Sequence, residues 1–374
     1  MNRRRLLQGA AALACAGSAV GHAQPGKPAQ RGPVVAQIID ISNEQQDISR
    51  DFLIGSRAAW QDINAKGGVR NRAVQHLSIE VDGTPASLRA AVAQIRDNPA
   101  CVALSGTASD PVASQLVALL QAEKLDIAHV APWLQNSSVT VDDRTFPIFA
   151  TRQEQIAHAL KSLTVMGVPE LAAIYASPRE YSLYREDVER SAAALKLKVR
   201  SFPAASDLKL QGQRLDQNTA AIVLFVGGTP ELVQFTQGLE KQSRQRYLIA
   251  LADVNLQTMV QMGGSRTTPV IATQAVPTVN NTRLAVVRNY RDTLAKLFDE
   301  PPASLSLAGF IAARYTHDVL SDVDAPLTRA NVLAAFQRRA DVDVGGFRVS
   351  FNQQRRGSTY VTQSMLATDG RLIG

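Results

Sequence analysis

Short apolar runs rich in β-branched residues alternate along the chain with longer stretches in which apolar residues recur every three or four positions. The short runs are typical of buried strands, and the longer stretches are typical of amphipathic helices. In the first half, each strand-like run adjoins a helical stretch, and the runs are 34–39, 78–81, 102–104 and 127–130. This alternation predicts a parallel sheet covered by helices.

The alternation restarts after an apolar stretch at 146–151. The next strand-like runs are 172–175, 199–202, 221–226, 248–251 and 270–273, with helical stretches such as 180–195 and 230–244 between them. Three further helical stretches follow, at 283–297, 305–323 and 328–339. The tail then has two strand-like runs, at 347–351 and 360–366. We therefore predict an α/β fold with two units, each built around a parallel central sheet.

One helical stretch runs through the segment 55–69, GSRAAWQDINAKGGV, and ends directly before a strand-like run. Ser49 is the expected N-cap, because its hydroxyl can accept a hydrogen bond from the first turn. Lys66 carries a charge that suits the negative end of a helix, and Gly67 or Gly68 can adopt the left-handed conformation that ends it. The segment predicts a helix that lies on a sheet through one face: Phe52, Ala59 and Ile63.

The same segment, with Asp-Ile-Asn-Ala-Lys-Gly-Gly-Val at 62–69, resembles the first helix of leucine/isoleucine/valine-type periplasmic binding proteins, which serve ABC importers. The likeness continues in order and spacing as far as the Gly-Gly-Phe sequence at 345–347. The resemblance implies a type I periplasmic binding protein fold, in which two Rossmann-like lobes are joined by a three-strand hinge and close on a ligand. The implied division is 33–150 and 277–342 for lobe 1, with 151–276 and 343–374 for lobe 2. The resemblance also implies that the tail runs 347–351 and 360–366 pair with lobe 2.

The first 23 residues, 1–23, have the features of an export signal, with three arginines at 3–5 before an apolar run at 6–20. The paired arginines suit a twin-arginine signal, ordinary Sec export is the alternative, and Cys15 leaves a lipoprotein anchor as a further alternative. No other apolar stretch reaches the ~20 residues that span a bilayer. We expect the signal to be removed, 24–32 to form a flexible leader, and the mature chain to reside in the periplasm.

Composition argues against some partners and cross-links. Removing the three signal arginines from the 40 basic residues leaves 37 against 33 acidic residues. No basic patch is interleaved with aromatic residues, so we expect no nucleic-acid partner. Of the two cysteines, Cys15 lies in the signal, which leaves Cys101 alone and predicts no internal disulfide. Cys101 opens a strand-like run, and we expect it to be a small buried apolar residue.

Candidate ligand-binding residues follow the third strand-like run. The loop 105–110, Ser-Gly-Thr-Ala-Ser-Asp, offers hydroxyls and backbone N–H groups, and parallel α/β sheets bind ligands outside the carboxyl ends of their strands. The resemblance implies that this loop, with Ser109 and Asp110, holds the carboxylate of an amino acid. The alternative is ordinary capping, in which Ser109 or Asp110 satisfies the first turn of the helix that contains Pro111.

Two positions depart from the pattern of amino-acid-binding relatives. Asp110 stands where they carry a serine that bonds the ligand carboxylate, and two like charges ~4 Å apart cost about 4 kcal/mol at an effective dielectric constant of ~20. Either Asp110 points away from the ligand, or the ligand is not a standard amino acid. Ala131 and Trp133, in Ala131-Pro132-Trp133, are further candidate contacts, and Trp133 stands where those relatives carry a threonine. Its indole offers an apolar or cation-π wall, or else it is buried against its own lobe.

The resemblance implies further ligand contacts from lobe 2. Tyr181 matches a tyrosine that covers the ligand, and Thr229 replaces another aromatic residue of that lid. Asp253 matches the acid that receives the ligand ammonium, with a turn or cap aspartate as the alternative. A retained ammonium side beside an altered carboxylate side favours a ligand with a positive or hydrogen-donating group and little negative charge, such as an amide, an amine or a heterocyclic compound.

Catalytic and metal-binding sequence patterns are absent, and the five histidines are scattered. We therefore expect no cofactor, no metal and no enzymatic activity. The sequence predicts the substrate-binding component of an ABC importer, with a small-molecule ligand and with membrane permease and ATPase subunits as partners. One alternative is a sensing module of the same fold that acts on a receptor or kinase. The other is an exported enzyme that uses His129, Asp110 and Asp253.

Overall fold

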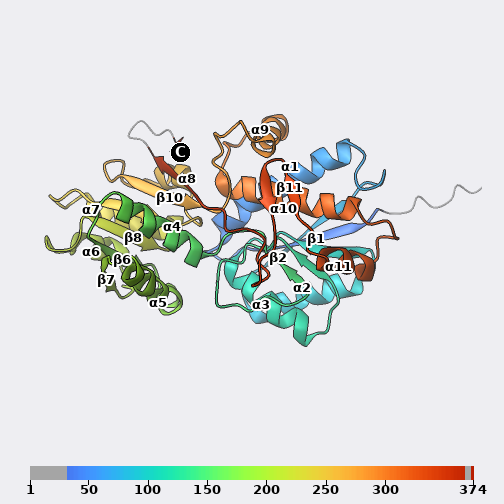
Figure 1. Ribbon diagram of the computed structural model, residues 1–374, viewed down its shortest axis with the longest axis horizontal. Coiled ribbons are helices and arrows are strands. Elements are labelled where there is room, and N and C mark those ends of the chain that lie inside the picture. Colours follow the sequence, from blue (N-terminus) through green and yellow to red (C-terminus); the bar gives the residue numbers. More distant parts are fainter. Residues whose placement is uncertain (1–31, 367–371) are drawn as a thin grey trace, which may run out of the picture. The chain divides into compact units, whose positions relative to one another are not determined.

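The computed structural model describes residues 32–366 and 372–374. Its first sheet has the strand order β2-β1-β3-β4-β5, and every neighbouring pair is parallel (Figure 1). The strands are β1 Val34–Asp40, β2 Gln75–Val81, β3 Cys101–Ser105, β4 Ala128–Val130 and β5 Thr145–Phe146. The parallel sheet predicted for the first half of the chain is thereby confirmed, although the apolar stretch at 146–151 contributes only the last residue of β5.

The second sheet has the order β14-β13-β10-β9-β8-β6-β7. Its parallel strands are β6 Glu170–Tyr175, β7 Lys198–Phe202, β8 Ile222–Val226, β9 Tyr247–Ala250 and β10 Val270–Gln274. Two antiparallel strands, β13 Thr362–Leu366 and β14 Leu372–Ile373, complete one edge. The predicted α/β class, with two mostly parallel sheets, is therefore confirmed.

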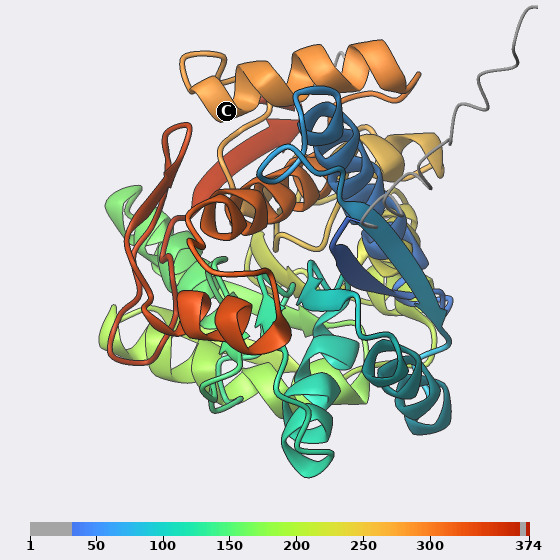
Figure 2. The ribbon, with the colours of Figure 1, turned by 90° about the vertical axis from the view of Figure 1, so that its right-hand side faces the viewer.

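Helices cover both faces of the first sheet, because successive residues of a strand point to opposite faces. One face packs against α1 Gln46–Ala65, α9 Ala285–Leu297, α10 Ser304–Ser321 and α11 Arg329–Gln337. The other face packs against α2 Pro85–Asp97 and α3 Asp110–Ala122. Figure 2 shows α1 in blue and α9 and α10 in orange on the side of the sheet opposite to the teal α2 and α3. Cys101 is buried in this core, as predicted.

The second sheet is covered in the same way. One face packs against α4 Arg152–Val165 and α5 Pro178–Ala194, and the other packs against α6 Leu208–Gln213, α7 Thr229–Leu239 and α8 Leu256–Gln261. The helical stretch predicted to reach residue 244 ends earlier, at Leu239. Beyond that point Gln242 turns back and donates its side-chain amide to the carbonyls of Gly212 and Leu215, at 2.9 and 2.8 Å.

Helices α1 and α10 approach each other through glycine. A Cβ atom placed on Gly55 would lie 1.7 Å from the carbonyl oxygen of Ser306, and one placed on Gly309 would lie 1.9 Å from that of Phe52. Neither position admits a side chain without moving the backbone of the other helix. Segments far apart in the sequence therefore share one core.

The structure confirms the predicted end of α1 but not its predicted start. Gly67 and Gly68 adopt positive φ angles of 106° and 69°, which confirms the predicted end of the helix. The predicted N-cap is wrong, because α1 begins at Gln46, which places Ser49 inside its first turn. The hydroxyl of Ser49 instead donates to the carbonyl oxygen of Ala108, at 2.7 Å, and accepts from the backbone N–H of Asp40, at 3.2 Å. Ser49 thus ties the helix to the sheet.

The tail divides between the two sheets. Residues 360–366 form β13 beside β10, which confirms their expected pairing with the second sheet. The same expectation is wrong for 347–351, since β12 Phe347–Val349 forms an antiparallel hairpin with β11 Val342–Val344. Gly345 and Gly346 have φ angles of 59° and 98°, and two such residues turn a strand directly back on itself. Phe347 and Val349 pack in the core beside the first sheet.

Some sequence predictions lie outside what the structure describes or tests. The export signal and all but the last residue of the leader 24–32 lie outside the described residues. The lobe boundaries at 150/151, 276/277 and 342/343 stay a prediction. Within the described chain, no helix combines the length and the apolar character needed to cross a membrane.

Candidate ligand-binding site

The loop after β4, residues 131–136, is held in place from several directions. Ala131 adopts a positive φ of 46°, which turns the chain away from the strand. The backbone N–H of Trp133 donates to the carbonyl oxygen of Thr107, at 2.8 Å. From the tail, the buried guanidinium of Arg356 donates to two carbonyl groups of the loop, at 2.8 and 2.9 Å. The loop is therefore a rigid platform at the carboxyl end of the first sheet.

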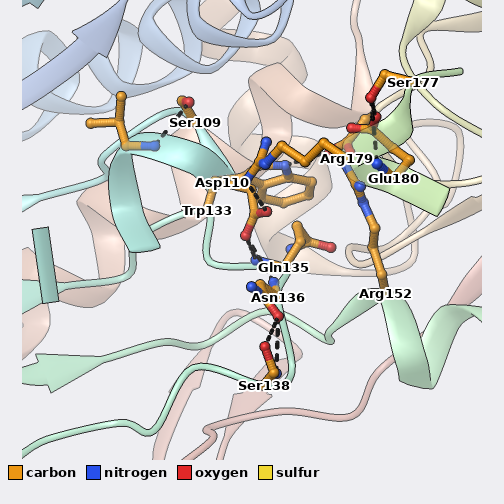
Figure 3. A network of polar contacts seen from close by, with 12 residues as sticks. Ser109, Asp110, Trp133, Gln135, Asn136, Ser138, Arg152, Ser177, Arg179 and Glu180 are labelled. Carbon is orange, nitrogen blue, oxygen red and sulfur yellow. Dashed lines mark hydrogen bonds and ion pairs between the residues drawn. The ribbon is translucent and has the colours of Figure 1, made fainter. Parts of the chain in front are cut away.

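Asp110 fixes the same loop from the first position of α3. Its buried Oδ1 accepts hydrogen bonds from the backbone N–H groups of Gln135 and Asn136, at 2.7 and 2.8 Å (Figure 3). Its Oδ2 lies 3.9 Å from Nη2 of Arg179, at the start of α5. Burial raises the pKa of this carboxyl group, with the charge of Arg152 and the hydrogen bond from Asn136 acting against that shift. One carboxylate oxygen is thus committed to the protein's own backbone.

Ser109 is the N-cap of α3, as the capping alternative predicts. Its Oγ accepts from the backbone N–H of Val112, at 3.4 Å, and donates to Oδ2 of Asp40, at 2.8 Å. The side chain is fully buried. Both polar functions of the Ser109 hydroxyl are therefore used within the first sheet and its helices.

Trp133 joins the first sheet to the loop after β9. Its ring lies in the apolar core, with ring centroids 5.3 Å from that of Phe149 and 6.0 Å from that of Phe52. Its indole Nε1 donates a hydrogen bond of 2.8 Å to Oδ1 of Asp253. The sequence assigned Trp133 and Asp253 to opposite sides of the ligand, and the structure brings the two side chains into direct contact.

Arg152 satisfies the other oxygen of Asp253. Its guanidinium forms a buried ion pair with Oδ2 of that residue, and its guanidinium carbon lies 4.8 Å from the ring centroid of Tyr184. Burial alone would lower the pKa of Arg152, but the acidic groups around it, Asp253 foremost, together outweigh burial and the net shift is upward. Both carboxylate oxygens of Asp253 thus have a partner.

A second set of contacts links α1 to the second sheet. The backbone N–H of Asn255 donates to Oγ1 of Thr229, at 3.0 Å, and Nδ2 of Asn255 donates to Oδ2 of Asp51, at 2.7 Å. Burial raises the pKa of Asp51, and the hydrogen bond from Asn255 opposes that shift. Thr229 therefore positions a residue that reaches the first helix.

Tyr181 lies on α5 but its described contacts are local. Its ring meets that of Tyr175 edge to face, with 5.2 Å between centroids, and the guanidinium of Arg185 lies 5.6 Å from its centroid. No hydrogen bond or ring contact within the described residues joins Tyr181 to Asp253 or Trp133. Of the seven residues chosen from the sequence, the structure gathers Asp110, Trp133 and Asp253 most closely around one group of side chains.

Three residues of this group were missed by the sequence reasoning: Gln135, Arg152 and Tyr184. Arg152 had a detectable signal, since it occupies the first position of α4, where the helix dipole favours an acid. Thr151 and Glu154 form a capping box around it, which identifies that helix start from the sequence. A cation at such a position predicts an acidic partner elsewhere in the fold. Gln135 and Tyr184 carried no comparable signal.

His129 lies inside the first sheet. Its Nε2 is 2.9 Å from Oγ1 of Thr107, and the side chain is fully buried. Burial lowers its pKa to about 4, so the ring is neutral at pH 7. This arrangement is that of a hydrogen-bonded structural histidine. Among the described residues, no group of three or more histidine, cysteine, aspartate or glutamate side chains is placed to hold a metal ion.

The sequence matches the family model described as periplasmic binding protein over residues 34–369, which is most of the chain. The chain belongs to the periplasmic binding protein family. The resemblance noted in the sequence is thereby confirmed, and the fold is the type I periplasmic binding protein fold. The family consists of substrate-binding proteins. No curated protein matches the sequence.

Solved structures of similar fold cover nearly the whole of this binding protein. An extracellular ligand-binding receptor from Verminephrobacter eiseniae is 19% identical, with a TM-score of 0.83 over 92% of this chain and 100% of its own. A substrate-binding periplasmic protein from Ralstonia solanacearum is 21% identical, with a TM-score of 0.81 over 91% and 99%. A branched chain amino acid ABC transporter protein from Thermus thermophilus, with bound valine, is 13% identical, with a TM-score of 0.77 over 92% and 95%. These identities establish the shared fold and leave the ligand open.

Proposed function

We propose that this chain is the substrate-binding component of an ABC importer, exported to the periplasm, where it captures a small polar ligand between its two sheets. A membrane permease and separate ATPase subunits would receive the ligand. Family membership supports the binding role. The observation that carries the proposal is the hydrogen bond between Trp133 and Asp253, because it joins the carboxyl end of one parallel sheet to that of the other. Ligands of parallel α/β sheets sit at such ends.

A small set of contacts supports hinge closure as the working motion. Among the links between the two sheets are single polar contacts: Trp133 with Asp253, Asn255 with Asp51, and Arg179 with Asp110. A ligand that binds the closed arrangement more tightly than the open one shifts the population toward closure. The closed arrangement would then be the form that the permease recognises.

The test is a ligand screen on the mature protein beginning at Gln24. A ligand at 100 times its Kd raises the free energy of unfolding by about 2.7 kcal/mol, which a thermal-shift screen of nitrogen and carbon compounds detects. Calorimetry then gives the affinity, and X-ray scattering reports compaction on binding. The expected result is a ligand that compacts the protein and binds more weakly to Trp133→Ala.

Uptake separates transport from sensing. Cells that lack this protein should take up the identified ligand more slowly, and restoring the gene should restore the rate. Unchanged uptake together with a lost transcriptional response to the ligand would favour the sensing module instead. Recovery of a chemically altered ligand from the complex would contradict a purely binding role.

A further inference from the structure

The side chains around Asp253 contain unpaired hydrogen-bond donors. Arg152 Nε, Gln135 Nε2 and Tyr184 Oη have no hydrogen-bond partner among the residues that the structure describes. The three side chains are only 7%, 0% and 1% exposed, respectively. Buried polar groups in folded proteins are nearly always hydrogen-bonded, so three such atoms in one place indicate a bound molecule that supplies acceptors.

These donors belong to one group of residues. The backbone N–H of Arg152 donates to the carbonyl oxygen of Gln135, at 3.0 Å, and the guanidinium of Arg152 packs on the ring of Tyr184. Gln155 donates to Oε1 of Gln135, which fixes the amide of Gln135 with its own Nε2 free. Figure 3 shows Gln135 between Asp110 and Arg152.

Most of the neighbouring carboxylate oxygens already accept hydrogen bonds, and Oδ2 of Asp110 faces the guanidinium of Arg179 at 3.9 Å. Asp253 accepts from Trp133 with one oxygen and from Arg152 with the other. Oδ1 of Asp110 accepts from two backbone N–H groups. Glu154 and Glu180 are hydrogen-bonded to the N-cap residues of their own helices. A ligand ammonium would therefore face donors and occupied carboxylates, and the guanidinium of Arg152 takes the position beside Asp253 that the sequence assigned to such an ammonium.

We propose that the ligand is a small organic acid that lacks an amino group, and that its carboxylate accepts hydrogen bonds from Arg152, Gln135 and Tyr184. A carboxylate has two oxygens with about four acceptor positions, enough for all three donors, and guanidinium groups match its planar geometry. This ligand class rests on the proposed binding function. It differs from the amine or amide class that the sequence alone favoured, because the sequence did not reveal Arg152.

Calorimetry on the mature full-length protein tests the ligand class with compounds that share a carbon skeleton. One set is 4-methylpentanoate, leucine, 4-methylpentanamide and 3-methylbutylamine, and an aromatic set is phenylacetate, phenylalanine, phenylacetamide and phenethylamine. Within the set whose carbon skeleton the site accepts, the acid without an amino group should bind at least tenfold more tightly than the amino acid, the amide or the amine. Tighter binding of any of those three would overturn the proposal.

Tyr184→Phe tests the site itself, because it removes only an oxygen that has no described protein partner. It should weaken binding of the acid about tenfold, the size expected for one hydrogen bond to a charged group, and leave the Tm of the unliganded protein unchanged. Tyr175→Phe is the matched control, since Tyr175 is buried in β6, in the same apolar core as Tyr184, and makes none of the contacts described around Asp253. Equal acid affinity in the wild type and Tyr184→Phe would refute the assigned contact.

Failure of this inference is distinguishable from failure of the proposed function. If the library screen yields an amino acid, an amine or an amide, the protein is still a binding protein and only the organic-acid class is wrong. If an acid outside the two sets binds, its dependence on Tyr184 decides the inference. If no compound in the wide library binds, the proposed function and this inference both fail.

Discussion

Asp110 and Asp253 are both buried carboxylates at the carboxyl end of a parallel sheet, but they are satisfied in different ways. Asp110 accepts from backbone N–H groups of the loop beside it. Asp253 accepts from the indole of Trp133 and the guanidinium of Arg152. Backbone donors belong to the fold and stay in place, whereas side-chain donors can turn or separate. Asp110 therefore builds the first sheet's platform, and Asp253 holds a contact that the proposed opening of the hinge would break.

The largest effect is expected from Asp253→Ala. It leaves the guanidinium of Arg152 buried without its acid, and breaking a buried ion pair in this way costs about 3–5 kcal/mol. Urea unfolding with and without the variant measures this loss. Adding Arg152→Met to Asp253→Ala removes the stranded charge and should return much of the lost stability. A double variant as unstable as the single one would show that the ion pair is not the cause.

The next effect is expected from Asp110→Ala, which leaves the N–H groups of Gln135 and Asn136 without their acceptor. Two unsatisfied buried donors cost about 3 kcal/mol together. Asp110→Asn is the conservative comparison, since its amide oxygen can still accept, and it should lose less. Thermal unfolding checks both variants. If Asp110 acted on the ligand rather than the loop, both variants would keep the wild-type Tm in the absence of ligand.

The third effect depends on pH and comes from His129, which is buried in the first sheet rather than among the contacts around Asp253. Burial lowers the pKa of His129 to about 4, whereas the unfolded chain titrates near 6.5, so the unfolded state binds more protons between these values. Stability should therefore fall as the pH drops through this window, by about 2 kcal/mol from pH 7 to pH 5 for this residue. His129→Gln should lose that share of the pH dependence, measured by urea unfolding at both pH values. An unchanged slope would mean that His129 titrates normally.

The smallest effect is expected from Arg179→Gln. The guanidinium of Arg179 is half exposed and 3.9 Å from Asp110, and such a pair contributes less than about 1 kcal/mol. Urea unfolding should barely distinguish the variant from the wild type, even at low salt. A loss of several kcal/mol would mean that the pair of Arg179 with Asp110 contributes as much to stability as the pair of Arg152 with Asp253. Asp110 and Asp253 would then both depend on a side-chain partner.

Much of the fold followed from local pattern. The strand-like runs predicted nearly every parallel strand, because apolar runs of this length are fully buried in such sheets. The end of α1 was predictable from Gly67 and Gly68, since a left-handed helix end favours glycine. The division of the tail between the two sheets was not predictable. It depends on the turn at Gly345 and Gly346, which pairs β12 with β11.

The candidate site was less accessible to sequence reasoning. Ser109 was predictable as a cap from its place before Pro111. The partners of Asp253 were not, because Trp133 and Arg152 lie 120 and 101 positions away in the chain and meet it only in three dimensions. Family likeness placed Asp253 at the ligand, but it carried no information on Arg152. By pairing with Asp253, Arg152 changes what that carboxylate can bind, although the aspartate itself is present.

The close approach of α1 and α10 at Gly55 and Gly309 has a consequence for folding during synthesis. Helix α1 requires the backbone of α10 at a distance that only glycine permits, and α10 is synthesised long after the strands of the first sheet. In the second sheet, by contrast, helices α5 to α8 lie in the sequence between the strands β6 to β10 that they cover. The first sheet is thus made early but receives α10 late, and until α10 is made the face of α1 that it covers is an exposed apolar surface of the kind that chaperones bind.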